Sequence, residues 1–198
     1  MNNNPGNETN PSERSSHKLV NALGNNIPNM IWMAAIFVAA TAAGYYKPEA
    51  VPKWLIADAM ETIKKMDNAW HDNLIVGAGA YFGQMALYLY AGFALGVATS
   101  IPSVYMMLST ALLTGAIAAT KGGNLSGAYP NTFPDFFEAA AMWLALSFGA
   151  KLGIAWFRKP RFKNVREAFL EGNMVFLKLV LPLLGAALIF RVIFGSGL

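Results

Sequence analysis

The fold is decided by the stretch Glu138-Ala-Ala-Ala-Met-Trp-Leu-Ala-Leu-Ser-Phe-Gly-Ala-Lys-Leu-Gly153, which is apolar except for an acid at its start and a lysine near its end. A bilayer core roughly 30 Å thick is crossed by about 20 apolar residues in helical form. Together with its neighbours, this stretch is long enough to cross. Charges at membrane depth are costly and usually have a partner or a function. The sequence therefore predicts a membrane helix with Glu138 as its most informative side chain.

The composition of the whole chain agrees with a membrane protein. Hydrophobic residues make up 55% of the 198 residues and charged residues only 13%, whereas a soluble domain carries about a quarter charged residues. The absence of cysteine excludes disulfides, thiolate metal sites and thiol catalysis. The net charge of +4 does not point to nucleic acid, because the basic residues gather beside an apolar segment, where an anionic membrane surface attracts them. We expect no cofactor, no metal and no nucleic-acid partner.

Five segments qualify as membrane spans, and they cover residues 27–45, 74–98, 102–120, 136–157 and 174–194. Residues 46–73 carry apolar side chains at helical spacing, which predicts a short helix lying on the membrane surface. Residues 1–26 are rich in Asn, Ser and Pro, so we expect a disordered polar tail. The predicted fold class is an all-α, polytopic membrane helical bundle that spans residues 27–198.

Basic residues near the spans predict the orientation. The loop between the fourth and fifth spans holds the densest cluster, namely Arg158, Lys159, Arg161, Lys163 and Arg166. Because cytoplasmic loops carry an excess of Lys and Arg, we expect the N-terminus inside a cell membrane and the C-terminus outside it. The 46–73 connection would also lie outside. A signal peptide cleaved after Ala40-Thr41-Ala42 is a less favoured alternative, since its leader would be long and weakly basic.

Glycines at four-residue spacing fall inside two of the spans. They are Gly79, Gly83, Gly92 and Gly96 in the second span and Gly149 and Gly153 in the fourth. Small residues let helix backbones approach closely in lipid. The two pairs of the second span lie on nearly opposite helix faces, so we expect that helix to contact different neighbours at its two ends. All six glycines are predicted helix-packing positions.

Polar side chains form a narrow stripe on the second span and another on the third. The first stripe contains Asn73, Gly77, Tyr81, Gln84 and Tyr88, and the second contains Ser103, Thr110, Thr114 and Lys121. In one interpretation the stripes face each other and line a polar path or a small-solute site. In the other, which the residue types favour, they serve interhelical hydrogen bonds, and the Ser and Thr hydroxyls bond to their own backbone.

Few ionisable side chains lie inside the predicted spans. Asp135 and Glu138 occupy the first turn of the fourth span, where a helix N-terminus favours negative charge. Glu138 would carry a proton only if it is desolvated. Lys151 lies about 20 Å further along the same helix, so we expect it not to pair with Glu138 but to extend to the cytoplasmic face beside Arg158.

The fifth span carries its own charges. Glu171 and Lys178 share one helical face, so they are expected to interact with each other or with a neighbour. Pro182 frees the carbonyl of Lys178 and allows a kink there. We expect Arg191 to snorkel toward the outer interface.

Motifs for catalysis are absent from the sequence. It has no phosphate-binding Gly-Lys-Ser/Thr loop and no nucleophile elbow. His17 and His71 are its two histidines, and His71-Asp72-Asn73 would bind a metal only with ligands from elsewhere. We therefore do not expect an enzyme.

Several motifs follow one another in a recognisable order. The fourth span opens with Glu138 after a Pro-containing turn and ends in Gly149-x-Lys151-x-Gly153, and Asn73 precedes a glycine-rich second span that includes Gly83. In these features, over roughly residues 73–194, the chain resembles the stage II sporulation protein M family of small polytopic membrane proteins. It departs from that family where Pro134-Asp135 replaces a His-Gly pair, where Ser109-Thr110 replaces an Asn-Gly pair, and where the last span lacks the usual acid.

The resemblance implies a non-enzymatic role, since the namesake is a membrane anchor that assembles with partner proteins that remodel the cell wall. Our first hypothesis is an integral membrane scaffold or assembly factor for a cell-envelope or transport complex. It would use the glycine faces for partner helices or for a second copy of the chain. The alternative is a small-solute or ion channel or transporter, with a polar path between spans two and three and Glu138 at its mouth.

Overall fold

The computed structural model describes residues 11–130 and 132–194, and every regular element in those ranges is helical. This confirms the predicted all-α class. The long helices are α1 (Pro11–Gly24), α2 (Ile27–Tyr46), α3 (Lys53–Asp72), α4 (Leu74–Ala94), α5 (Ile101–Thr120), α6 (Phe133–Ala155), α7 (Arg161–Val175) and α8 (Leu181–Phe194). Four short helical segments join them: η1 (Pro48–Ala50), η2 (Leu95–Val97), η3 (Leu125–Ala128) and η4 (Phe176–Val180).

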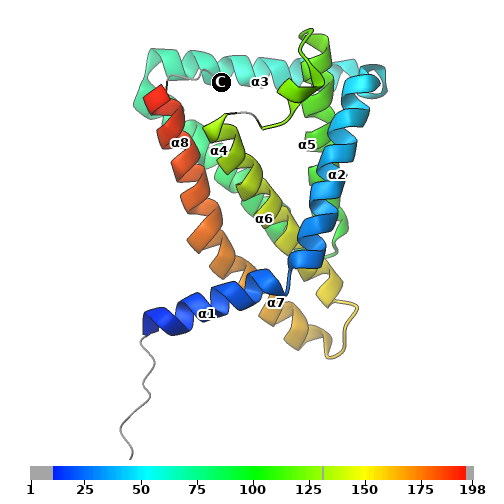
Figure 1. The fold of residues 1–198 in the computed structure, drawn as a ribbon, viewed down its shortest axis with the longest axis vertical. Helices are drawn as coiled ribbons and strands as arrows, with labels where there is room; N and C mark the ends of the chain where they lie inside the picture. Colours follow the sequence, from blue (N-terminus) through cyan, green and yellow to red (C-terminus); the bar gives the residue numbers. More distant parts are fainter. Residues whose placement is uncertain (1–10, 131, 195–198) are drawn as a thin grey trace, which may run out of the picture.

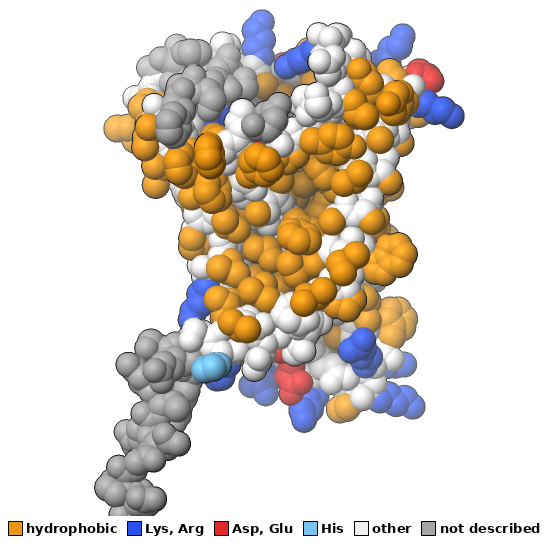
Figure 2. Space-filling view, viewed as in Figure 1, with side chains coloured by type: hydrophobic (Ala, Val, Ile, Leu, Met, Phe, Trp, Pro, Cys, Tyr) orange, Lys and Arg blue, Asp and Glu red, His pale blue; other side chains and the backbone are white. Residues whose placement is uncertain are grey.

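Five helical stretches in the described part of the chain are long and apolar enough to cross a membrane, which makes this a multi-pass membrane protein. They are α2, α4 with η2, α5, α6, and the continuous run of α7, η4 and α8. Figure 1 shows them running between two ends of the molecule. In Figure 2, orange apolar side chains cover the middle of the visible face, and Lys and Arg lie toward its two ends. An apolar band between charged ends is the surface that a bilayer requires.

The observed spans differ little from the predicted ones, apart from the fifth. That span is one helical run of 33 residues from Arg161 to Ile193, because α7 continues through η4 into α8. The segment η4 is π-helical and ends two residues before Pro182. Pro182 has no N–H to donate to the carbonyl of Lys178, four residues earlier. A π-helical turn at this point changes which carbonyls the following N–H groups bind, as π-bulges inside α-helices do.

Helix α6 is the centre of the bundle. Its apolar stretch is 61% buried, whereas the other four spans are 17–28% buried. It packs against α2, α4, α5, α7 and α8, and Leu146, Phe148 and Leu152 are almost completely enclosed. The outer helices therefore shield α6 and turn most of their own apolar side chains outward.

Glycines bring the backbones of neighbouring helices into direct contact at two crossings. Where η2, the end of the second span, crosses α6, a Cβ added to Gly96 would lie 2.2 Å from the carbonyl oxygen of Gly149. At the α2–α5 crossing, a Cβ added to Gly44 would lie 2.1 Å from the carbonyl oxygen of Leu112, and one on Gly115 would lie 2.0 Å from that of Thr41. Only residues without a side chain fit at such distances.

Helix α1 lies across one end of the bundle, called here the α1 end (Figure 1). The prediction of a disordered tail is wrong for residues 11–24, and residues 1–10 lie outside the described part of the chain. The signal that it overlooked is the spacing of Leu19, Ala22 and Leu23, which places three apolar side chains on one helix face. Ala22 is buried in a cluster with Ala168 of α7, so tertiary packing stabilises this short helix.

Helix α3 lies across the opposite end, called here the α3 end (Figure 1). It has 20 residues and is longer than the short helix expected there. Ile56 is buried against α5, whereas Trp54 is 71% exposed. On the exposed side, the hydrogen bond from Lys65 to Glu61 lowers the pKa of Glu61 and raises that of Lys65. One face of α3 thus packs on the bundle and another carries charge, as in an interfacial helix.

Candidate functional site

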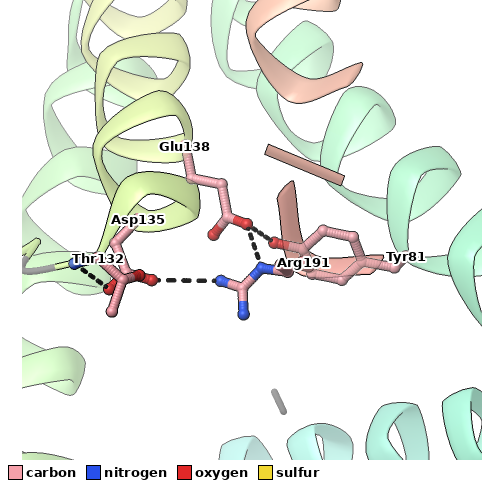
Figure 3. A network of polar contacts seen from close by, with 5 residues as sticks. All are labelled: Tyr81, Thr132, Asp135, Glu138 and Arg191. Atoms are coloured by element: carbon pink, nitrogen blue, oxygen red, sulfur yellow. Dashed lines mark hydrogen bonds and ion pairs between the residues drawn. The ribbon is translucent and has the colours of Figure 1, made fainter. Parts of the chain in front are cut away.

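Four side chains from three spans meet near the α3 end (Figure 3). Arg191 of α8 donates from Nε to Glu138 Oε1 of α6 at 2.8 Å, and its Nη2 lies 3.4 Å from Asp135 Oδ1. The hydroxyl of Tyr81 of α4 donates to the same Glu138 oxygen. The guanidinium also lies over the Tyr81 ring, 5.5 Å from its centroid. We call these four residues the Glu138 network.

The start of α6 places both carboxylates on one face. Thr132 and Asp135 form a capping box, in which the Thr132 N–H donates to Asp135 Oδ2 at 3.2 Å. This arrangement satisfies backbone groups that the first helical turn leaves open. Glu138 follows Asp135 by three residues and so lies one turn deeper on the same face. The sequence Thr-Phe-Pro-Asp therefore sets both the start of α6 and the position of its acids.

Arg191 lies inside the bundle, so the prediction that it snorkels to the interface is wrong. Its side chain is 10% exposed and that of Glu138 is 16% exposed. A guanidinium can bind two carboxylates at once through its planar fork of donors. Both carboxylates lie within reach of the guanidinium, so the hydrogen bonds to them compensate for the hydration that Arg191 loses on burial. The result is a set of charge-assisted hydrogen bonds that ties α4, α6 and α8 together.

A cavity of about 280 Å³ lies beside the network. Thr110 and Thr114 of α5 line it, together with Asp135 and Glu138. The described carboxylates of the network outnumber its guanidinium by two to one. The cavity therefore has an acidic wall facing two hydroxyl-bearing residues.

The two predicted polar stripes meet at Tyr88 and Thr110, and Ser103 of the second stripe bonds to the backbone of Gly92, outside the first. The Tyr88 hydroxyl lies 2.7 Å from Thr110 Oγ1, and Ser103 Oγ donates to the carbonyl oxygen of Gly92 at 2.8 Å. Thr114 instead donates to the Thr110 carbonyl in its own helix, also at 2.8 Å. These contacts are the interhelical and backbone hydrogen bonds of the favoured interpretation.

The other polar side chains of the second-span stripe do not face α5. Tyr81 faces the Glu138 network rather than α5. Gln84 is exposed on the outer surface. Asn73 is the N-cap of α4 and accepts hydrogen bonds from the N–H groups of Ile75 and Val76. The stripe therefore does not form one continuous polar lining against α5.

A second ion pair lies near the α1 end. Lys151 Nζ of α6 donates to Glu171 Oε2 of α7 at 2.6 Å, and it lies 5.4 Å from the centroid of the Phe148 ring. The lysine side chain lines the same cavity as Arg158, as expected from its place near the end of the span. It is only 19% exposed, however, and binds Glu171 instead of extending freely to the membrane face. The expectation that Glu171 meets a neighbour is confirmed, and that neighbour is Lys151. Lys178 is exposed within η4.

The six predicted packing glycines divide into two groups. Gly92, Gly96, Gly149 and Gly153 each have atoms of another helix or turn within 3 Å of an added Cβ. Gly79 and Gly83 have nothing within 4 Å, so they do not pack against any described part of this chain. Within the described part of the chain, the close glycine packing expected at both ends of the second span is therefore found only at Gly92 and Gly96.

Sequence reasoning missed three features of the bundle. The pairing of Arg191 with Glu138 has no signal in spacing, since the two lie 53 residues apart. Gly44 and Gly115 are not four residues from a second glycine, so the search for paired glycines passed over them. Asn26 was assigned to the tail, yet it is fully buried and donates to Ser147 Oγ at 3.0 Å. Its place two residues before Pro28, at the N-cap of the first span, was the one available hint.

No family model, curated protein or solved structure matches this chain. Among the side chains that the structure describes, which do not include those of His71 and Asp72, no group of three or more His, Asp and Glu is arranged to hold a metal ion.

Proposed function

We propose that this chain is a non-enzymatic membrane scaffold that binds another membrane protein through the outer face of α4. The complex would belong to the cell envelope or to a transport system. The proposal includes the resemblance to the stage II sporulation protein M family and the predicted orientation, with the α1 end in the cytoplasm.

The observation that carries the proposal is the open glycine face of α4. We define it as the exposed side chains at helical spacing Val76, Gly79, Ala80, Gly83, Gln84 and Leu87. Three of the six residues are glycine or alanine, which permit close approach of a helix backbone. Gln84 brings an exposed amide into a membrane span. In lipid, such an amide favours a hydrogen bond to a neighbouring helix.

The Glu138 network supports the same function. Its buried groups bind one another across α4, α6 and α8, so these ionisable side chains stabilise the bundle without needing a solute. A bundle that satisfies its own charges and leaves one small-residue face uncovered is suited to holding a partner helix. The amphipathic helix α3 provides a further contact surface on the other side of the membrane from the basic loop.

Photo-crosslinking in cells tests this proposal. With a photoreactive residue in place of Gly83, we expect one discrete adduct with a second membrane protein, because the glycine face approaches its partner closely. The matched control replaces Ile189 of α8, which is 57% exposed on another part of the bundle. That position should yield only lipid adducts.

The variant Gly83→Leu provides the second part of this test. Nothing lies within 4 Å of an added Cβ there, so the variant should unfold at the wild-type temperature but lose the co-purified partner. Equal adducts at positions 83 and 189, or full partner recovery with Gly83→Leu, would contradict the proposal. An adduct of two copies of this chain would instead assign the face to self-association.

The alternative function is a channel or transporter for a small solute or ion. One observation favours it, namely the acidic cavity that joins Thr110 and Thr114 to Asp135 and Glu138. Flux into liposomes that contain the purified protein distinguishes the two functions. If this alternative holds, flux occurs and Glu138→Gln abolishes it, whereas the scaffold proposal expects no protein-dependent flux.

A further inference from the structure

We infer that a cavity at the α1 end binds a zwitterionic headgroup that carries both a phosphate and a primary amine, as an aminophospholipid does. The cavity has a volume of about 380 Å³. It lies between the turn that joins α1 to α2, the end of α6 and one face of α7. Both charged and amide side chains line it, and those used here are Asn29, Lys151, Arg158, Asn164, Glu167 and Glu171. This site is separate from the Glu138 network and from the glycine face, so it does not depend on the proposed function.

The cavity offers positive charge for a phosphate. Lys151 has three donors on its ammonium group, and one of them is used by Glu171 at 2.6 Å. The guanidinium of Arg158 is exposed and forms no ion pair with any described residue. Arginine and lysine are the usual partners of phosphate groups in proteins. Asn29 adds a half-buried amide to the same wall.

The cavity also offers negative charge for an amine. Glu171 is 37% exposed, so its carboxylate is only partly enclosed by the bond to Lys151. Glu167 is 59% exposed and its Oε1 lies 4.0 Å from Lys163 Nζ, which is a loose contact. An ammonium group placed between these acids would form charge-assisted hydrogen bonds with them.

Only a ligand with both charges complements the whole lining. The two bases Lys151 and Arg158 are balanced by the two acids Glu167 and Glu171. A purely anionic headgroup would be repelled by the two acids, and a purely cationic ligand would be repelled by the two bases. A quaternary ammonium lacks N–H donors for the carboxylates. A phosphate joined to a primary amine satisfies the bases and the acids together.

The place of the cavity favours a lipid as the source of this headgroup. Lys151 lies four residues before the end of α6, beside the basic loop that begins at Arg158. Basic residues at span ends mark the level of lipid headgroups. At the lip of the cavity, Pro28 is exposed and Ile154 is 36% exposed. Acyl chains can therefore continue from the cavity along an apolar surface.

The turn that carries Arg158 is held in place by the same wall. Asn164 Nδ2 donates to the Arg158 carbonyl oxygen at 3.0 Å, and Asn29 Nδ2 donates to Asn26 Oδ1 at 2.8 Å. Asn26 is in turn anchored to Ser147 in the centre of the bundle. These bonds order three of the elements around the cavity before any ligand enters, which lowers the cost of binding.

Lipid retention measured by native mass spectrometry tests the inference. Delipidated full-length protein in a mild detergent is mixed with equal amounts of phosphatidylethanolamine, phosphatidylcholine and phosphatidylglycerol of identical acyl chains. We expect phosphatidylethanolamine to be retained about fivefold more than either other lipid. Arg158→Gln and Glu167→Gln should each bring this preference close to one, because each removes one of the complementary charges. Lys159→Gln, which changes a neighbouring base outside the cavity lining, should leave it unchanged.

A soluble competitor distinguishes a lipid from a free ligand. If glycerophosphoethanolamine displaces the bound lipid at similar concentration, the headgroup chemistry is supported and its source is a soluble compound. Equal retention of the three lipids by the wild-type protein would overturn the inference. So would an unchanged preference in both Arg158→Gln and Glu167→Gln. Because the first of these comparisons uses only wild-type protein, it holds even if a variant does not fold.

Discussion

The variant Arg191→Met is expected to lose about 3 kcal/mol of stability, which is typical of removing one partner from a buried ion pair. Methionine keeps much of the side-chain volume, so the loss reports on charge rather than on a void. Without the guanidinium, Glu138 and Asp135 remain as two neighbouring carboxylates with Glu138 only 16% exposed. The measurement is reversible unfolding in mixed detergent micelles, followed by the far-ultraviolet circular dichroism signal.

A second substitution shows whether the loss comes from the unpaired acid. The double variant Arg191→Met with Glu138→Gln should recover more than half of the lost stability, since glutamine is neutral and still accepts from Tyr81. Arg166→Met is the matched control, because Arg166 is exposed on α7. If Arg191→Met costs no more than Arg166→Met, the network does not stabilise the bundle.

The variant Gly96→Ala is expected to destabilise the protein by at least about 3 kcal/mol, at the upper end of overpacking effects. The new Cβ would lie 2.2 Å from the carbonyl oxygen of Gly149, and a backbone atom has no rotamer by which to move away. The η2 segment at the end of the second span must then move away from α6. The same unfolding assay measures the effect.

The matched control for Gly96→Ala is Gly79→Ala in the same helix. Nothing lies within 4 Å of an added Cβ at Gly79, so this variant should be as stable as the wild type or slightly more stable, since alanine is the better helix former. Similar losses from both substitutions would show that α4 responds to any change of glycine. The close crossing would then not be the cause.

Much of the bundle was predictable because its signals are local. Length and apolarity identified all five spans, and the start of α6 fell within a few residues of its observed position. The spacing of Gly92, Gly96, Gly149 and Gly153 correctly indicated close packing, because four-residue spacing places small residues on one helix face. Asn73 needed only its place before an apolar run to be found at the N-terminus of α4.

The partners of the charged residues were not predictable, because they depend on how distant helices meet. Lys151 and Arg191 were both expected to extend freely toward the interfaces, which is the usual behaviour of a long cationic side chain near a span end. Each instead binds a carboxylate on another element. The helix α1 was missed for a related reason, since Leu19, Ala22 and Leu23 stabilise it by packing in a cluster with Ala168 of α7, which the local sequence does not show.

The Glu138 network and the Lys151–Glu171 pair both fix the position of α6. One lies near each end of that helix, and each joins it to the continuous run of α7, η4 and α8. The central helix is thus fixed to the last span at two levels. Between these levels the contacts are apolar, as in the cluster that contains Leu146 and Val180.

Cysteine accessibility in intact cells tests the membrane path most directly, because the chain has no cysteine of its own. Lys121→Cys places a thiol at the α3 end, and Lys163→Cys places one at the α1 end, both at exposed positions. A membrane-impermeant maleimide should label Lys121→Cys from outside, and Lys163→Cys only after the membrane is opened. Labelling of both cysteines from the same side, before any permeabilisation, would contradict a chain that crosses the bilayer between these two ends.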